Sequence, residues 1–211
     1  KEVTVEDVLG SKMVADPLHL LEICATSDGG AAVVLTSEAY ARKHATQWCS
    51  VAGVSTVTPV YPNTVMEMPN MSTDSAASVP LPPVGFRDSI TKGAYEQAGI
   101  GPEDGELAEV YDLASALELD WYENIGLCGP GEAEKLLRDG VTALGGRLPV
   151  NPSGGLACFG EAVPAQALAQ VCEITWQLRG QAEGRQAGTP RVGITANQGL
   201  FGHGSSVILT R

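Results

Sequence analysis

The chain has 211 residues, of which 44% are hydrophobic and 18% charged, so it can bury a sizeable core and is not expected to be disordered. A formal net charge of −12 argues against a nucleic-acid partner, because binding to a phosphate backbone requires a basic surface. The sequence contains no run of roughly 18 apolar residues and no signal-peptide pattern, which predicts a cytoplasmic protein without a membrane span.

The first part of the chain predicts two strands, a helix between them and a long irregular segment. Residues 33–35 follow a glycine-rich turn and are predicted to form a buried strand, and the helix is expected over residues 37–44. β-Branched residues alternate over residues 51–60, which indicates the second strand. Residues 61–85 contain five prolines and three methionines, which indicates a long loop that is either functional or disordered. The methionines favour an ordered, adaptable apolar lining over disorder.

Helices and strands alternate in the rest of the chain, which predicts an α/β layered architecture. Ser115 and Glu118 have the spacing of a capping box at the start of one helix. Pro164 stands at the start of another, which runs to Gly180. Helices are predicted over residues 87–98, 115–125, 132–138 and 164–180, and strands over residues 107–110, 191–196 and 205–210.

An internal similarity links the two ends of the chain. Residues 30–36 read Gly-Ala-Ala-Val-Val-Leu-Thr and residues 204–210 read Gly-Ser-Ser-Val-Ile-Leu-Thr. The match indicates either two apolar strands of similar composition or a duplicated fold whose halves end in equivalent strands.

A glycine-rich turn at residues 151–160 leads into the helix that ends at Gly180. Backbone N–H groups of Ser153, Gly154 and Gly155 in such a turn can approach an anion or a carbonyl oxygen closely. Glu161 follows as a lone carboxylate near a helix start. It is a candidate base, a water-binding group, or a carboxylate that stabilises the helix dipole.

Several motifs occur in an order and spacing that resemble the thiolase superfamily, in particular its sterol-carrier-protein-X and lipid-transfer-protein branch. They are residues 24–35, 94–100, 109–112, 127–132 and 151–156. The resemblance covers nearly the whole chain. It implies a layered α/β/α fold with a mixed five-stranded sheet covered by helices. It also implies that residues 1–50 end a first half-domain, whose remaining part is missing here, and that residues 51–211 form the second.

Three positions depart from the thiolase pattern. Tyr111 stands where thiolases carry Asn or His, and Glu161 stands where they carry the His of a Gly-His-Pro motif. Gln198 lies nearest to the position of their second catalytic cysteine. Because Claisen chemistry needs a thiolate and an acid/base that exchanges protons with it, these departures argue against thiolysis and condensation.

Within the family, the chain most resembles bacterial aldolases that shorten steroid side chains. The resemblance implies cleavage of a β-hydroxyacyl-CoA into a ketosteroid and a short acyl-CoA such as propionyl-CoA. Retro-aldol cleavage requires a base, an acid and an oxyanion hole but no covalent nucleophile. An acyl-CoA thiolase with its nucleophile in the missing part, and a non-catalytic lipid-carrier subunit, are the alternatives.

Four residues are candidate catalytic groups. Tyr111 is a candidate acid or base, and as a base it would need a nearby positive charge to lower its pKa from about 10. Tyr61 lies where a predicted strand meets the long loop, as either a catalytic or a packed side chain. Glu161 is the third. His203, in a glycine-flanked turn, is either a donor to a thioester oxygen or a surface residue.

The remaining expectations concern ligands and partners. Asn197, Gln198 and Gly199 are predicted to bind a substrate oxygen, together with the turn at residues 153–155. The resemblance implies coenzyme A as part of the substrate and no covalently bound cofactor. It also implies a homodimer formed through the missing half and a partner with an OB-fold and a zinc ribbon. Five scattered cysteines and three histidines lack metal-ligand spacing, which predicts reduced thiols and no metal site.

Overall fold

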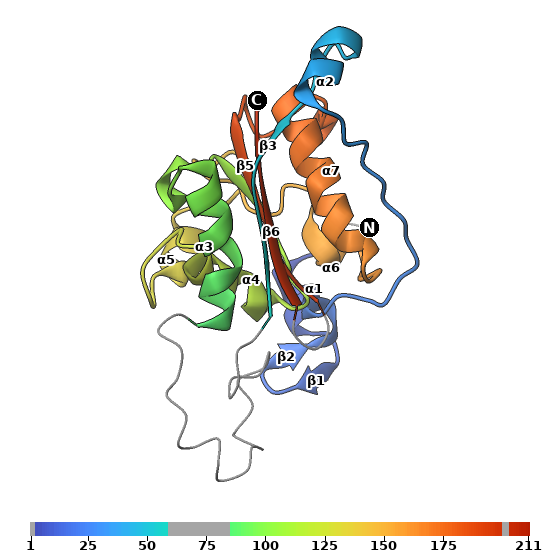
Figure 1. Ribbon diagram of the computed structural model, residues 1–211. Helices are drawn as coiled ribbons and strands as arrows, with labels where there is room; N and C mark the ends of the chain where they lie inside the picture. The colour runs from blue at the N-terminus through green and yellow to red at the C-terminus, as the bar shows by residue number, and fades with distance from the viewer. Residues whose placement is uncertain (1–2, 59–84, 200–202) are drawn as a thin grey trace.

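The computed structural model describes residues 3–58, 85–199 and 203–211. A mixed sheet in the order β3-β6-β5-β4 forms its centre, with α3 and α4 on one face and α6 and α7 on the other (Figure 1). The strands are β3 (Ser50–Val57), β4 (Leu107–Val110), β5 (Val192–Gly199) and β6 (His203–Thr210). The predicted layered α/β/α fold is therefore confirmed.

The helices end where local sequence predicts. The last turns of α3 and α7 stop at Gly99 and Gly180, whose φ angles of 68° and 70° are left-handed and suit glycine. The packed helices are α3 (Phe86–Ala98), α4 (Ser115–Asn124), α5 (Ala133–Arg138), α6 (Gly155–Phe159) and α7 (Ala165–Arg179). The N-terminal part adds α1 (Val5–Leu9), β1 (Met13–Ala15), β2 (Leu18–His19) and α2 (Glu38–His44).

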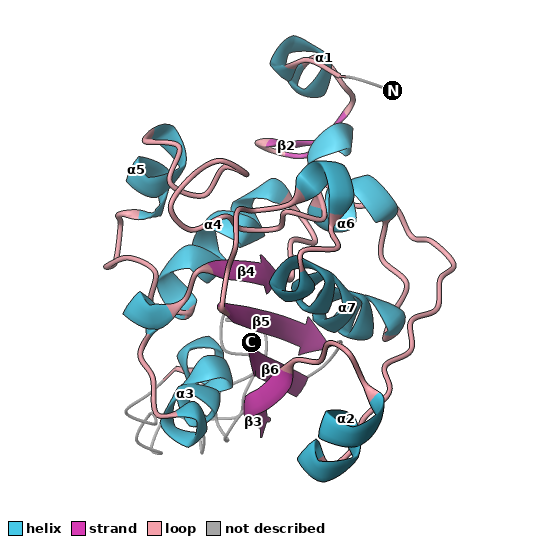
Figure 2. Cartoon of the chain, turned by 90° about the horizontal axis from the view of Figure 1, so that it is seen from above, coloured by secondary structure: helices cyan, strands magenta, loops and turns pink. Residues whose placement is uncertain are grey.

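The strand pairing brings two distant segments to one edge of the sheet. β4 and β5 are parallel, with Val110 opposite Ala196, whereas β5–β6 and β6–β3 are antiparallel (Figure 2). The backbone N–H of Tyr111 donates to the carbonyl oxygen of Ala196 at 3.0 Å. The carboxyl ends of β4 and β5 therefore lie side by side, which is where α/β folds commonly place their sites.

The number of strands differs from the prediction. The central sheet has four strands within the described ranges instead of five, and a single bridge between Val150 and Ala108 lies beside β4. The segment then turns away at Asn151, whose φ is 49°. The Asn151 side-chain oxygen accepts from the N–H of Val110 at 2.8 Å, so a side chain extends the ladder where the backbone leaves it.

The prediction of a buried strand at residues 33–35 is wrong. These residues form an extended loop, and Val34 and Leu35 are 91% and 77% exposed. No strand pairs with them in the part of the chain that the structure describes. The similar stretch at residues 204–210 does form a strand, because β3 and β5 flank it.

The prediction of a capping box at the start of α4 is also wrong. Ala114 is the N-cap residue, and no side chain caps the helix. The Ser115 hydroxyl instead donates to Glu22 at 3.0 Å, and Glu118 accepts from the side chain of Asn151 at 2.9 Å. Tertiary hydrogen bonds therefore replace the local one that the spacing suggested.

The other predicted elements are confirmed with shifts of a few residues at their ends. The strand predicted at residues 51–60 is confirmed as far as Val57. The predicted loop at residues 61–85, with Tyr61, falls almost wholly outside the described residues and stays a prediction. The half-domain boundary at residue 50 stays a prediction as well.

The two faces of the sheet are packed differently. The face under α3 and α4 is filled by large apolar side chains, each of which contributes about 2–3 kcal/mol when fully buried. They include Ile90, Trp121, Tyr122, Ile194 and Ile208. On the other face the apolar cluster of Leu107, Ile174, Leu178 and Leu209 is smaller. It lies beside buried polar residues of α7, which are Gln166, Gln170, Glu173 and Gln177.

Candidate active site

Tyr111 and Glu161 meet at the carboxyl end of β4. Tyr111 is the first residue after the strand, and Glu161 lies between α6 and α7. The Tyr111 hydroxyl donates a hydrogen bond to a carboxylate oxygen of Glu161. Burial raises the pKa of Tyr111, and the hydrogen bond to the Glu161 carboxylate raises it further. Tyr111 is therefore protonated at neutral pH, and Glu161 is the group positioned to accept its proton.

The backbone around Glu161 is fixed by the N-terminal part of the chain. The Glu161 N–H donates to the carbonyl oxygen of Ala25 at 2.8 Å, and the N–H of Ser27 donates to the Glu161 carbonyl at 3.0 Å. Gly160 precedes it with a φ of 78°, and a Cβ there would lie 2.7 Å from the Ala25 oxygen. Only glycine fits this approach, so residues 25–27 form one wall of the site.

Cys24 belongs to the same wall and was missed by the sequence analysis. Its N–H donates to the carbonyl oxygen of Leu113 at 3.0 Å, which holds it beside the residues that follow β4. Burial raises the pKa of the Cys24 thiol, and the nearby Glu161 and Asp112 carboxylates raise it further. The thiol is therefore protonated at neutral pH and is a poor nucleophile.

Two buried carboxylates hold the glycine-rich turn against β4. Glu109 accepts from the backbone N–H and the hydroxyl of Ser153 at 3.0 and 2.7 Å. Asp112 accepts from the N–H of Leu156 at 2.8 Å. A Cβ on Gly155 would lie 2.0 Å from the second Asp112 oxygen, so this contact requires glycine. Burial raises the pKa of Glu109 to about 8 and that of Asp112 to about 6.

The N–H groups of this turn already have partners. Besides the Ser153 N–H, the N–H of Gly154 donates to the Asn151 carbonyl at 2.9 Å, and that of Gly155 donates to the Ser153 hydroxyl at 3.1 Å. An oxyanion hole formed by Ser153, Gly154 and Gly155 would need one of these hydrogen bonds to be released. Their predicted role in binding a substrate oxygen therefore stays a prediction.

The other predicted site residues lie along the hairpin of β5 and β6. The Asn197 side chain is buried and donates to Gln170 at 2.8 Å. Gln198 and Gly199, both half-buried, follow it along β5. His203 is exposed opposite Gly199, and no hydrogen bond of the described residues joins it to the Tyr111–Glu161 pair. Its catalytic role, like that of Tyr61 outside the described ranges, stays a prediction.

A small cavity of about 180 Å³ lies behind the turn. Glu109 and Ser153 form one side, and the ion pair of Glu173 and Arg185 forms another, with nitrogen–oxygen distances of 2.8–3.1 Å. Because Arg185 already binds Glu173, it leaves Glu109 without a cation of its own. Burial is the main reason that the pKa of Glu109 is raised, and the nearby Glu173 and Asp112 carboxylates raise it further.

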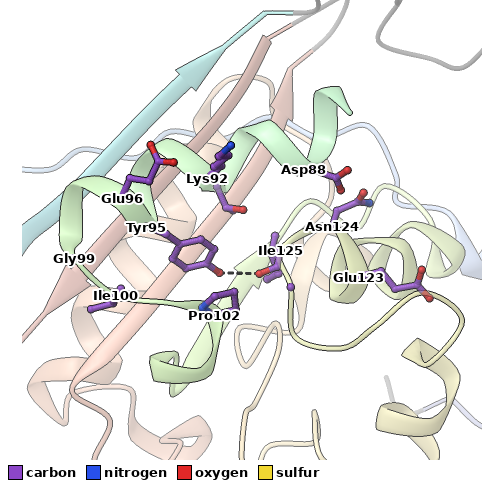
Figure 3. A pocket seen from close by; sticks show the side chains of 12 residues that line it. Asp88, Lys92, Tyr95, Glu96, Gly99, Ile100, Pro102, Glu123, Asn124 and Ile125 are labelled. Atoms are coloured by element: carbon purple, nitrogen blue, oxygen red, sulfur yellow. Dashed lines mark hydrogen bonds between the residues drawn. The ribbon is translucent and has the colours of Figure 1, made fainter. Parts of the chain in front are cut away.

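A larger hollow of about 470 Å³ lies on the opposite face, between α3 and the end of α4 (Figure 3). The Tyr95 hydroxyl donates to the carbonyl oxygen of Ile125 at 2.8 Å, and Lys92 and Glu96 stand at the rim. None of the predicted site residues in the described ranges lines it. We therefore place the candidate site at the carboxyl end of β4, where an acid and a base are in contact.

Two further observations concern metal ions and membranes. The five cysteines are free thiols, as predicted, and no group of three or more His, Cys, Asp or Glu side chains in the described ranges could hold a metal ion. Among the helices that the structure describes, none has the length and apolar character needed to cross a bilayer.

Residues 73–211 match the family model described as thiolase C-terminal domain-like. The chain belongs to the thiolase superfamily. Tyr111 and Glu161 both lie within the matched residues.

Relatives named as a sterol carrier protein and as a steroid-CoA lyase are similar to the chain over nearly its whole length. Sterol carrier protein 2 of Bos taurus is 34% identical over 210 residues, which are 100% of this chain and 37% of that protein. The 17-hydroxy-3-oxo-4-pregnene-20-carboxyl-CoA lyase of Mycobacterium tuberculosis is 33% identical over 209 residues, or 95% of this chain and 49% of the lyase. The chain thus spans half or less of the length of these relatives.

A solved structure shares the fold. The Ltp2-ChsH2(DUF35) aldolase superposes with a TM-score of 0.75 at 24% sequence identity, covering 99% of this chain and 51% of that chain. At this identity the similarity shows a common thiolase-like fold. It confirms the layered arrangement seen in Figure 1.

The carboxylates that support the site were not predicted from the sequence. Glu109 and Asp112 flank Tyr111 within four residues, yet they were read only as part of a family motif. The indication available in the sequence was their position, since Glu109 lies within an apolar strand and Asp112 lies just after it. Charged residues are seldom buried without a specific partner, so such a position points to a functional or supporting role.

Proposed function

We propose that this chain is half of a carbon–carbon lyase that cleaves the β-hydroxyacyl-CoA of a steroid side chain into a ketosteroid and a short acyl-CoA such as propionyl-CoA. The observation that carries the proposal is the hydrogen bond between the Tyr111 hydroxyl and the Glu161 carboxylate. It supplies an acid and a base at two positions that depart from the thiolase pattern. The mycobacterial relative, named as a pregnene-carboxyl-CoA lyase, supports the same reaction class.

The raised pKa of Tyr111 sets the direction of proton movement. A phenolate base would need a neighbouring cation, but the neighbour of Tyr111 is a carboxylate. In the proposed step the Tyr111 oxygen accepts the proton of the β-hydroxyl group while its own proton passes to Glu161. The bond between the β-carbon and the α-carbon then breaks, which leaves a ketone and a thioester enolate. The same proton returns through Tyr111 to the enolate carbon, so atoms and charge balance.

The remaining parts of the proposal follow the family. Coenzyme A enters as part of the substrate, and Asn197, Gln198 and the turn at residues 153–155 are the candidate donors to the thioester oxygen. Tyr61 and His203 are further candidate acid/base groups. We also propose a homodimer, an OB-fold and zinc-ribbon partner protein, and a cytoplasmic location.

The decisive test is Tyr111→Phe in the full-length protein, assayed with a steroid β-hydroxyacyl-CoA. We expect turnover to fall at least about a hundredfold, the usual effect of losing a general acid/base. Tyr95→Phe is the matched control, because the Tyr95 hydroxyl donates to a backbone carbonyl on the other face of the sheet. Turnover of Tyr111→Phe close to that of the wild type would contradict the proposal.

The alternatives predict different products. A thiolase would release acetyl-CoA or propionyl-CoA from a 3-oxoacyl-CoA only when free CoA is added. A non-catalytic lipid carrier, which similarity to sterol carrier protein 2 supports, would bind the steroid acyl-CoA without forming any product. The two outcomes separate these functions from cleavage.

A further inference from the structure

α7 turns a row of polar side chains toward the sheet. Gln166, Gln170, Glu173 and Gln177 follow one another at helical spacing and are at most 3% exposed. Three of the four have partners. Gln170 accepts from Asn197, and Glu173 accepts from both Arg185 and Gln177.

Gln166 is the exception in this row. Its side-chain carbonyl oxygen is buried and has no hydrogen-bond partner within the described residues. Leaving such a group unpaired costs about 1–3 kcal/mol, and native structures contain few of them. The other two unpaired atoms, in Ser206 and Arg179, lie elsewhere. Ser206 is on the strand that packs against α3, and Arg179 is at the far end of α7.

The first turn of α7 places Gln166 beside the candidate site. Its N–H donates at 3.2 Å to the carbonyl oxygen of Ala162, the residue after Glu161. One helical turn later, Gln170 binds Asn197, which follows Ala196 in β5. Gln166 therefore stands four residues after Ala162, at the start of the helix face that contacts β5, and the Tyr111 N–H bonds to Ala196 of the same strand. Figure 1 shows α7 beside the sheet, on the side opposite α3.

A hydrogen-bond donor on the ligand can satisfy this unpaired acceptor oxygen. Near the reacting atoms, a β-hydroxyacyl-CoA offers two donors, the β-hydroxyl group and the amide N–H nearest to the sulfur. In the proposed reaction the hydroxyl proton goes to Tyr111, and a hydroxyl has only one proton to donate. The amide N–H is the donor that remains.

We propose that the Gln166 carbonyl oxygen accepts a hydrogen bond from the acyl-CoA amide nearest to the thioester. The inference rests on the proposed function, because it takes the ligand to be an acyl-CoA. Gln166 is then a positioning residue: the bond fixes the thioester relative to Tyr111 and Glu161, and it occupies an oxygen that the protein leaves unpaired.

The test compares propionyl-CoA with an analogue in which an ester oxygen replaces that N–H. Dissociation constants are measured by calorimetry on the full-length protein, so the result does not depend on cleavage. We expect the wild type to bind the amide about tenfold more tightly than the ester, the scale of one buried hydrogen bond. Gln166→Leu should bind propionyl-CoA about tenfold more weakly than the wild type does. It should bind the amide and the ester with dissociation constants that differ by about twofold or less.

Gln170→Leu is the matched control, because the Gln170 oxygen is already bonded to Asn197. It should keep the preference for the amide. Gln166→Met serves as a second apolar variant if Gln166→Leu does not fold. A preference that survives in the Gln166 variants, or that is absent from the wild type, would overturn the inference. A wild type that shows the preference but cleaves no β-hydroxyacyl-CoA would refute the lyase and leave the Gln166 contact standing. Failure to bind either thioester would refute both.

Discussion

The two faces of the central sheet use buried polar groups in opposite ways. Under α3 and α4, the polar tips of Tyr95 and Trp121 donate to backbone carbonyls of Ile125 and Tyr111. The Tyr122 hydroxyl donates to Glu118, and apolar side chains fill most of the remaining space. Under α6 and α7, several carboxylates and carboxamides are buried. They form hydrogen bonds mainly with one another and with the glycine-rich turn. The first face is packed mainly by apolar side chains, and the second holds the residues of the candidate site in place.

Tyr95 and Tyr111 show this difference for one residue type. Both are 8% exposed, and burial raises the pKa of both. The Tyr95 hydroxyl donates to the backbone carbonyl of Ile125, which cannot accept the proton itself. The Tyr111 hydroxyl donates to the Glu161 carboxylate, which can. The partner, rather than the burial, distinguishes Tyr111 from Tyr95. Tyr122, whose hydroxyl also donates to a carboxylate, Glu118, differs from Tyr111 by its place on α4.

The largest effect on stability is expected on the apolar face. Ile90 is fully buried, so Ile90→Ala should lower the free energy of unfolding by about 3–4 kcal/mol through lost burial and the cavity it leaves. Ile90→Val, which removes one methyl group, should cost about 1 kcal/mol. Urea denaturation measures both. A loss below about 1 kcal/mol for the alanine variant would show that this face is less tightly packed than the structure indicates.

A smaller effect is expected at the glycine-rich turn on the other face. Gly155→Ala would place a Cβ 2.0 Å from an Asp112 oxygen at a φ of 62°, so the turn must shift. We expect a loss of about 2–3 kcal/mol in the free energy of unfolding, from backbone strain and the weakened contact. Gly145→Ala is the control, since nothing lies within 4 Å of a Cβ there. Equal stability of the two variants would argue against the contact between Asp112 and the turn.

The smallest effect is a pH dependence due to Glu109. Its folded pKa of about 8 lies above the unfolded value, so the native state binds the extra proton. Stability is therefore lost as pH rises toward 8. Between pH about 6.5 and 8, where Asp112 with a pKa of about 6 is already ionised, the wild type should lose about 1–2 kcal/mol through Glu109. Over the same pH range, the free energy of unfolding of Glu109→Gln should fall by about 1–2 kcal/mol less than that of the wild type. Urea denaturation at the two pH values measures both.

Exposed Glu134, which pairs with Arg138 on the surface of α5, provides the control for this titration. Glu134→Gln should retain the pH dependence of the wild type. If Glu109→Gln also retains it, Glu109 is not protonated in the native state at neutral pH. The contrast between the two faces would then rest on packing rather than on charge.

The candidate site was predictable from the sequence only in part. Tyr111 and Glu161 were recognised because they depart from a family pattern, but their hydrogen bond joins residues 50 positions apart. Nothing local to either residue specifies that bond. Glu109, Asp112 and Gln166 were not predicted, because their importance comes from burial and from the presence or absence of a partner.

The sequence by itself determined the elements whose causes are local. The apolar patterns of α3 and α7 and the glycines that end them predicted both helices, since helix periodicity and a left-handed C-terminal residue need no distant contact. Tertiary structure decided what depends on neighbours. Residues 33–35 have the composition of a strand but form none without an adjacent strand, whereas residues 204–210 lie between two. The physical reason is that a strand, a buried carboxylate and an acid–base pair each need a partner that only the folded chain brings into contact.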